Sequence, residues 1–582
     1  MTFLNLNTVC RPVLHLTLVT LILSALFLSG CAVTQPTADG TDAQGTAETE
    51  DLPLTPQVDL SAEILHQFLI SELAYYRNDV LTSIDILEKL AFETNDPRIA
   101  EIASLRAIGN QQYDVASNTT YLWVMLSPDS AEAWFSNAVS MIATQRYDEA
   151  VEAFQKNLQL STDDDQIKFQ KVSHSLGSAV DPNLAFDLFD RIISEFPESI
   201  FGRLSSIELA VAAEKDEEFI DQLVSEGLAM APKSDDMASA KFFVNIRRGA
   251  VSEAVEFAKK FLSRNPDSPN LRHHYARHLV DEGLNREAIK QYEMLTDAES
   301  LYMQGTLHEQ ANFPELSRDK FLAFHRLQPE NQRVLINLAE LALEKRDYEE
   351  AGAWISRITN RNLGFSRYLL TAKYIAGTRS IDEAVALLEE HPTESQRERV
   401  RIILVVEDLY RNDGRFDDAF SVLEAGLGEF PGNITLLLAK SYTAAELNLI
   451  DQVEMTVNAI LAQQPDNALA LNALGYTLID QTDRLEEGTD YIEKALEIKP
   501  NDPFILDSMG WAHFKLGNFE DAIELLSAAL SRRDDPVMAA HLGEVYWTIG
   551  RTQKARQLWD DARQKSPDNE ILIETIERLT SQ

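Results

Sequence analysis

Two segments near the carboxyl end of the chain repeat one another without a gap. Residues 503–530, PFILDSMGWAHFKLGNFEDAIELLSAAL, match residues 536–567 at a constant offset of 33. The offset pairs Gly510 with Gly543, Gly517 with Gly550, Ala522 with Ala555 and Ala529 with Ala562. Small residues let two helices cross closely, and a glycine allows the left-handed turn that ends a helix, so each unit is expected to be a helical hairpin. A hairpin of this size must bury its apolar face on its neighbours, and the chain is therefore expected to be a stacked array.

The same pattern recurs upstream in weaker form. One copy is marked by Trp134, Ala138, Tyr147, Ala150 and Phe154, and another by Tyr410, Gly414, Phe416, Ala419 and Pro431. With this spacing, residues 62–567 would hold about fifteen hairpins. We expect divergent repeats over residues 61–400, well-defined repeats over 401–567, and a capping helix over 568–582, where NEILIETIERLTSQ closes the chain.

These residues resemble the tetratricopeptide repeat, a helix-turn-helix unit of about 34 residues. The resemblance implies an all-α solenoid wound into a right-handed superhelix, with a concave face that binds peptides, helices or whole proteins. No alternating strand pattern interrupts the array, so the expected fold class is all-α throughout.

The first thirty residues have the layout of a secretory signal. Residues 13–28 form an apolar run that ends in small residues and is short for a membrane span. The junction Leu28-Ser29-Gly30-Cys31 resembles the bacterial lipobox, which implies cleavage before Cys31 and acylation of that cysteine. Because Ala32 follows rather than Asp, the resemblance points to the periplasmic face of the outer membrane. Residues 31–60 contain no aromatic side chain and are expected to form a flexible acidic tether.

Composition narrows the function classes. The chain has 93 acidic and 52 basic residues, a formal net charge of −41, and such a surface disfavours nucleic-acid binding. Its two cysteines, Cys10 and Cys31, fall in the expected signal and at its end, so neither a Cys nucleophile nor a Cys-rich zinc site is expected. No phosphate-binding loop, zinc-protease or nucleophile-elbow motif occurs. We therefore expect a protein that is not an enzyme and that holds no cofactor or metal.

One segment, residues 270–283, gathers basic side chains. Arg272, His273 and Arg277 could form a basic patch that binds a carboxylate of a partner, and plain surface is the alternative. His274 and His278 lie four residues apart, at metal-ligand spacing, but no third ligand accompanies them.

Aromatic residues in the last three repeats supply a candidate binding groove. These are Tyr476, Phe504, Trp511, Phe514 and Trp547, and the resemblance places them on first-helix positions that line the concave face. Exposed aromatic side chains would act as rigid anchors for a partner. The alternative is that neighbouring helices bury them.

The whole-chain layout is similar to that of long tetratricopeptide lipoproteins of Gram-negative Gammaproteobacteria. Among them is the lipoprotein binding partner of a carboxyl-terminal processing protease. This resemblance implies an adaptor that holds a periplasmic serine protease and presents its substrates, typically peptidoglycan hydrolases. The alternative is a subunit of an envelope assembly or export machine for polysaccharide, pili or outer-membrane proteins. The oligomeric state is not predicted.

Overall fold

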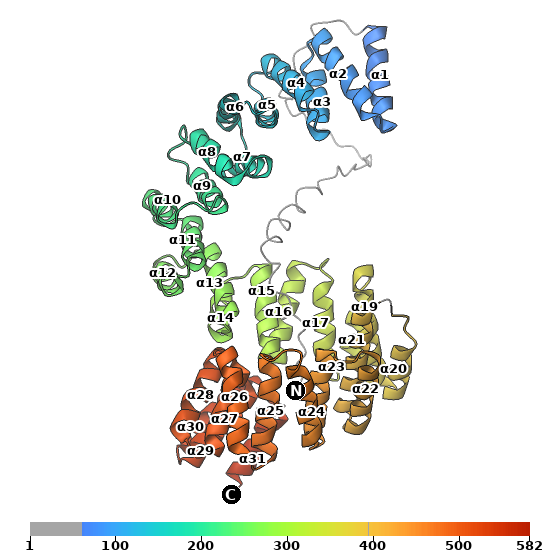
Figure 1. The fold of residues 1–582 in the computed structure, drawn as a ribbon, viewed down its shortest axis with the longest axis vertical. Coiled ribbons are helices and arrows are strands. Elements are labelled where there is room, and N and C mark those ends of the chain that lie inside the picture. Colours follow the sequence, from blue (N-terminus) through green and yellow to red (C-terminus); the bar gives the residue numbers. More distant parts are fainter. Residues whose placement is uncertain (1–60, 394, 582) are drawn as a thin grey trace, which may run out of the picture.

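The computed structural model describes residues 61–393 and 395–581 (Figure 1). Its elements are helices throughout these ranges, which confirms the expected all-α class. The expected signal, the lipobox residues Leu28 to Cys31 and the whole of the expected tether lie outside the described residues.

Thirty of the helices pair into fifteen consecutive hairpins, and α31 follows as the cap that the sequence predicts. The first six hairpins are α1 (Ala62–Tyr76) and α2 (Val80–Thr94), α3 (Pro97–Gly109) and α4 (Tyr113–Leu126), α5 (Ala131–Ala143) and α6 (Tyr147–Leu160), α7 (Asp165–Ala179) and α8 (Pro182–Ile193), α9 (Ile200–Ala212) and α10 (Glu217–Met230), and α11 (Asp235–Arg247) and α12 (Val251–Arg264). The next six are α13 (Pro269–Asp281) and α14 (Asn285–Tyr292), α15 (Ala298–Gln310) and α16 (Pro314–Leu327), α17 (Arg333–Glu344) and α18 (Tyr348–Arg357), α19 (Gly364–Thr378) and α20 (Ile381–Glu389), α21 (Gln396–Asn412) and α22 (Phe416–Glu429), and α23 (Ile434–Glu446) and α24 (Ile450–Leu461), with the 3₁₀ turn η1 (Arg361–Leu363) before α19. The last are α25 (Ala468–Gln481) and α26 (Leu485–Ile498), α27 (Pro503–Lys515) and α28 (Phe519–Arg532), α29 (Pro536–Thr548) and α30 (Thr552–Lys565), and α31 (Glu570–Thr580).

A left-handed residue closes most of the hairpin turns, including those of divergent repeats. Gly517 and Gly550 have φ of 82° and 80°, as the repeat alignment predicts. The same position is taken by Gln145 at 60°, Glu214 at 49° and Arg346 at 60°. The turn geometry is thus kept where the glycine is lost, which explains why sequence matching weakens in the middle of the chain although the hairpins continue.

Small residues set the closest approach of the two helices within a hairpin. A Cβ on Gly510 would lie 2.6 Å from Cγ of Leu526 in α28, which confirms the expected crossing point. A Cβ on Gly475 of α25 would lie 2.6 Å from the carbonyl oxygen of Gly488 in α26. The contacts at these glycines therefore leave no room for a methyl group.

The helices are arranged so that the first helix of each hairpin lies on the inner side of the curve. First helices contact one another along most of the chain, as α17 does α19 and α25 does α27, whereas contacts between successive second helices are far sparser. In Figure 1, α1–α12 form an open arc, and α13–α31 gather into a more compact part in which the C-terminal repeats return to α14.

The two ends of the array differ. Helix α31 buries Leu572 against α29 and turns its charged side chains outward, and so closes the C-terminal end. Across the described ranges, none of the helices combines the length and hydrophobicity that a bilayer crossing needs.

The close approach at Gly475 yields a first prediction. Gly475→Ala forces a methyl group against the backbone of Gly488, which cannot move without separating the hairpin, so we expect a loss of about 1–3 kcal/mol. The control is Gly428→Ala in α22, where a Cβ meets nothing within 4 Å and the helix should gain about 0.5–1 kcal/mol. Urea unfolding followed by circular dichroism measures both. Equal midpoints for the two variants would contradict the assigned crossing point.

Candidate protein-binding surfaces

The aromatic residues of the last three repeats are packed between hairpins rather than presented as free anchors. Trp511 is 7% exposed, its ring stacks on His541 at 4.4 Å between centroids, and its indole nitrogen donates to Asp480 Oδ1 at 3.4 Å. Phe514 lies 5.0 Å from the Trp511 ring. Of the two alternatives, burial therefore holds for Trp511, because the first helix of the following hairpin covers it.

The other members of the aromatic set are half-buried. Phe504 lies beneath the Arg533 guanidinium at 4.6 Å, and Trp547 packs 5.6 Å from Trp559. Tyr476 lies on α25. Burial, together with the nearby carboxylates of Asp480, Asp507 and Glu446, raises the pKa of its hydroxyl well above the usual range. These side chains lie on first helices of their hairpins, and much of their surface is packed against neighbouring residues of the stack.

A charged network surrounds the buried tryptophan. His541 Nδ1 lies 2.9 Å from Asp507 Oδ2, and both side chains are almost fully buried. Burial alone lowers the pKa of His541, but the charges of Asp507, Glu544 and Asp480 outweigh it and raise the net pKa above the ordinary 6.5. Arg578 of α31 pairs with Glu544 at 2.6 Å, which connects the cap to this network.

The expected basic patch on α13 is not a free positive surface. Arg272 is 5% exposed and donates to Gln291 Oε1 at 2.9 Å and to the Pro266 carbonyl at 3.0 Å. Burial lowers its pKa. The neighbouring His273 lies 3.0 Å from Asp297, and Arg277 lies 2.9 Å from Glu299. The three side chains therefore do not form a free basic patch, because Arg272 is buried and acidic residues of α15 and its N-cap pair with the other two.

The histidine pair on α13 is divided between two environments. His278 packs edge-on against Phe242 of α11 at 5.8 Å. Burial, followed by the charges of Arg277 and His273, lowers the pKa of His274. Among the described residues, no group of three or more His, Cys, Asp or Glu side chains converges into a metal site.

The most exposed apolar surface of the described chain lies at the opposite end, on α1. Leu65, Leu69, Leu73 and Tyr76 are 46%, 51%, 55% and 85% exposed, and their spacing of i, i+4, i+8 and i+11 places them on one side of the helix. We call these four residues the α1 stripe. The core face of the same helix carries Ile64 and Ser71 instead.

The α1 stripe belongs to a broader concentration of exposed apolar residues. Ten of the 25 exposed large hydrophobic side chains in the described chain lie between residues 65 and 125. Beyond α1 they include Leu81 and Phe92 of α2 and Tyr121 and Met125 of α4. At the C-terminal end of the array, α31 packs on the last hairpin. The α1 stripe lies on the first hairpin, where it is open to packing by another element or by a partner.

Sequence reasoning missed this surface although the signal is present. The segment AEILHQFLISELAYY carries apolar residues on two sides of one helix, and only one side is needed for its own hairpin. The second apolar face is visible once the core face has been assigned from the structure.

Family models of the tetratricopeptide repeat match residues 302–363, 411–475, 468–502 and 508–570. These segments are similar to tetratricopeptide repeats. The first of them lies within residues 61–400, where divergent repeats are expected, so recognisable repeats extend into the middle of the chain.

Two relatives and two solved structures place the chain among similar proteins. The TPR repeat-containing protein PA4667 of Pseudomonas aeruginosa is 28% identical over 578 residues, 96% of each chain. The human protein O-mannosyl-transferase TMTC1 is 25% identical over 179 residues, 29% of this chain and 20% of the relative. The Cut9–Hcn1 structure of the APC/C covers 89% of this chain and 96% of its own at 14% identity and a TM-score of 0.30. TTC0263, a thermophilic TPR protein of Thermus thermophilus, covers 31% of this chain and 97% of its own at 22% identity and a TM-score of 0.29.

The His541–Asp507 pair makes folding stability depend on pH. Because the folded pKa of His541 lies above 6.5, its stabilising contribution is complete below about pH 6.5 and is lost as pH rises through the folded value. We expect the difference in urea midpoint between the wild type and His541→Gln to shrink from about pH 6 to pH 9. The control is Gln553→Ala, an exposed position on α30 that changes no ionisable group and should show a flat difference. An increasing difference for His541→Gln would contradict the assigned charge state.

Proposed function

We propose that the chain is a non-catalytic adaptor, anchored by a lipid on Cys31 to the periplasmic face of the outer membrane. It binds a periplasmic carboxyl-terminal processing serine protease and presents that protease with substrates such as peptidoglycan hydrolases. The tetratricopeptide repeats support a scaffold for protein–protein interaction. The similarity to PA4667 over 96% of both chains supports one shared architecture from end to end.

The observation that carries the proposal is the α1 stripe. An apolar surface of this exposure on a highly acidic protein is costly in water unless something covers it. Leucine and tyrosine side chains on a rigid helix suit docking against an apolar patch of a folded partner. The stripe is also close in sequence to the proposed anchor, since α1 begins 31 residues after Cys31. A partner docked there is therefore held near the membrane.

The adaptor acts through local concentration. A protease held on α1 and a substrate held elsewhere on the same solenoid meet at an effective concentration that can reach the millimolar range. The curvature of the array, with first helices on the inner side, offers a separate surface for the substrate. No catalytic group of this chain takes part in the cleavage.

Substitution in the α1 stripe tests the docking surface. Leu69→Glu with Leu73→Glu places two charges in the proposed interface, where burial of unpaired carboxylates is costly, and should weaken protease binding about tenfold or more. Stability should hold, because both side chains are exposed. The matched control is Leu327→Glu with Met455→Glu, which puts the same charges at exposures of 56% and 54%. Binding is measured by surface plasmon resonance and folding by circular dichroism.

Reconstitution separates the adaptor from its alternatives. The purified chain alone should hydrolyse neither peptidoglycan hydrolases nor a generic protease substrate, and it should accelerate their cleavage by the protease. Hydrolysis by the chain alone would refute the adaptor. Capture of export or polysaccharide components from an envelope extract, with no protease bound, favours the assembly-machine alternative. Protease binding that survives the stripe substitutions would remove α1 from the proposal.

Replacement of the proposed lipidation site tests the anchor. Cys31→Ser removes the thiol that would carry the acyl chains, so the chain should move from the outer-membrane fraction to the soluble fraction. Its circular dichroism should not change, because the described hairpins begin at Ala62. Cys10→Ser, which lies in the expected signal, is the control and should leave the chain in the membrane fraction. Membrane association of the Cys31→Ser variant would contradict lipid anchoring there.

A further inference from the structure

Two parts of the solenoid that lie far apart in sequence touch. Ser566, after α30, donates a hydrogen bond from its hydroxyl to the carbonyl of Asn312, 254 residues earlier, at 2.8 Å. The ammonium of Lys565 lies 5.3 Å from the centre of the Phe313 ring. Helix α14 also contacts α28. These contacts close the hairpins from α13–α14 to α29–α30 into a ring, and we call the contact region the seam (Figure 1).

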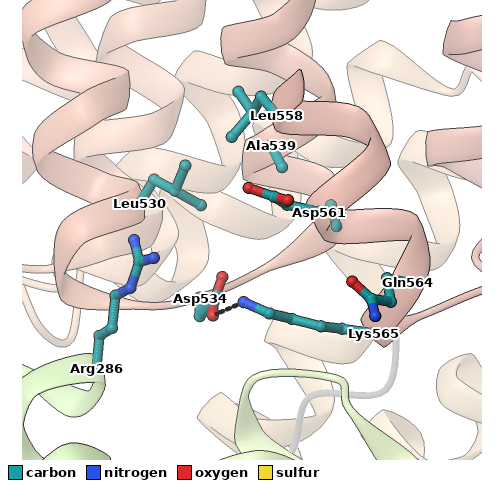
Figure 2. Close-up of a pocket in the computed structure, with 9 residues that line it drawn as sticks. Arg286, Leu530, Asp534, Ala539, Leu558, Asp561, Gln564 and Lys565 are labelled. Atoms are coloured by element: carbon teal, nitrogen blue, oxygen red, sulfur yellow. Dashed lines mark hydrogen bonds and ion pairs between the residues drawn. The ribbon is translucent and has the colours of Figure 1, made fainter. Parts of the chain in front are cut away.

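The seam contains a cavity of about 150 Å³ (Figure 2). Arg286 extends into it from α14, and the opposite wall comes from the C-terminal repeats, with Leu530, Leu558, Asp534, Asp561 and Lys565. Lys565 pairs with Asp534, its neighbour on the same side. Arg286 is exposed, forms no ion pair with another described residue, and extends from the side of the cavity opposite Asp534 and Asp561 (Figure 2).

This construction contrasts with the interfaces inside the hairpins. Within a hairpin, helices meet without room for a methyl group, as at Gly475 and Gly488. At the seam, the contact of α14 with α28, one hydrogen bond and one cation–π contact lie around a cavity. The hairpins between the two sides contact mainly their neighbours, so small rotations at each interface add up around the ring. The seam therefore lacks the close backbone approach of the hairpin crossings, and rotations that accumulate around the ring act on it.

We propose that the seam opens and closes reversibly, so that the repeats from α13 to α31 alternate between a closed ring and an open spiral. Opening gives a polypeptide access to the inner faces of the first helices, and closing retains it there. This access role rests on the proposed function, since the polypeptide is the substrate that the adaptor presents. The opening itself does not depend on any partner.

The distance across the seam tests the opening. Spin labels are placed on Lys290→Cys in α14 and Asp560→Cys in α30, both exposed, in the full chain with Cys10→Ser and Cys31→Ser so that no other thiol reacts. Pulsed electron paramagnetic resonance should give a dominant short distance and a minor long one. Because salt screens the attraction between Arg286 and the opposite carboxylates, the long population should grow as salt is raised. One distance that does not change with salt would overturn the proposal.

A charge reversal at the seam gives a second readout. Lys565→Glu removes the contact with Phe313 and sets a carboxylate beside Asp534, so the long-distance population should rise at least threefold. Lys554→Glu makes the same change on the same helix, where Lys554 lies over Tyr546 and away from the seam, and should leave the distances unchanged. Equal distributions for the two variants, with unchanged helical circular dichroism, would also overturn the proposal. If Lys565→Glu fails to fold, the salt titration of the unsubstituted chain decides.

A reversible lock tests access. Asn312→Cys with Ser566→Cys places two thiols at the hydrogen-bonded pair, and their disulfide should reduce the distance distribution to the short population. The locked ring should stimulate proteolysis of a peptidoglycan hydrolase by the carboxyl-terminal processing protease at least fivefold less than the same protein after reduction. Equal stimulation in both states would refute the access role. Absence of protease binding in both states would refute the proposed function and leave the opening to be judged from the distances.

Discussion

The packing of two helices against each other at small residues is the constraint on which the rest of this structure depends. Where Gly475 faces Gly488, and where Gly510 faces Leu526, the backbones come so close that side chains on the flanks are directed toward the neighbouring hairpins. Each hairpin therefore buries its apolar face on the next one. Fifteen hairpins stacked in this way form a curved array, because first helices approach one another more closely than second helices do.

This stacking decides which side chains remain available to a partner. Inside the array, a first-helix aromatic such as Trp511 meets the next first helix and is stacked on His541, so its surface is used in stability. At the C-terminal end, α31 packs against α29 and covers the apolar face of the last hairpin. The first hairpin has no such cover among the described residues, and the α1 stripe stays exposed there. The proposed docking surface is thus a consequence of where the array begins.

Curvature has a second consequence, which appears only over many repeats. A gradual turn brings Ser566 back to Asn312 and sets α28 against α14. No single hairpin needs this contact in order to fold, and the residues that form it differ from those at the hairpin crossings. It borders a cavity lined by both charged and apolar side chains, and it lacks the small-residue crossings of the hairpins. A ring closed by such a contact is well suited to reversible opening.

Local pattern determined much of this protein. The offset of 33 residues, the paired glycines and the final helix were enough to predict a capped all-α array of about fifteen hairpins, because helix crossing and left-handed turns leave a mark at fixed positions. The fate of individual side chains was not determined in this way. Which side chains are buried depends on which element packs next to each residue. This holds for the burial of Arg272, for the covering of Trp511 by α29, for the second apolar face of α1 and for the seam. That depends on the curvature summed over many interfaces, a quantity that no short stretch of sequence contains.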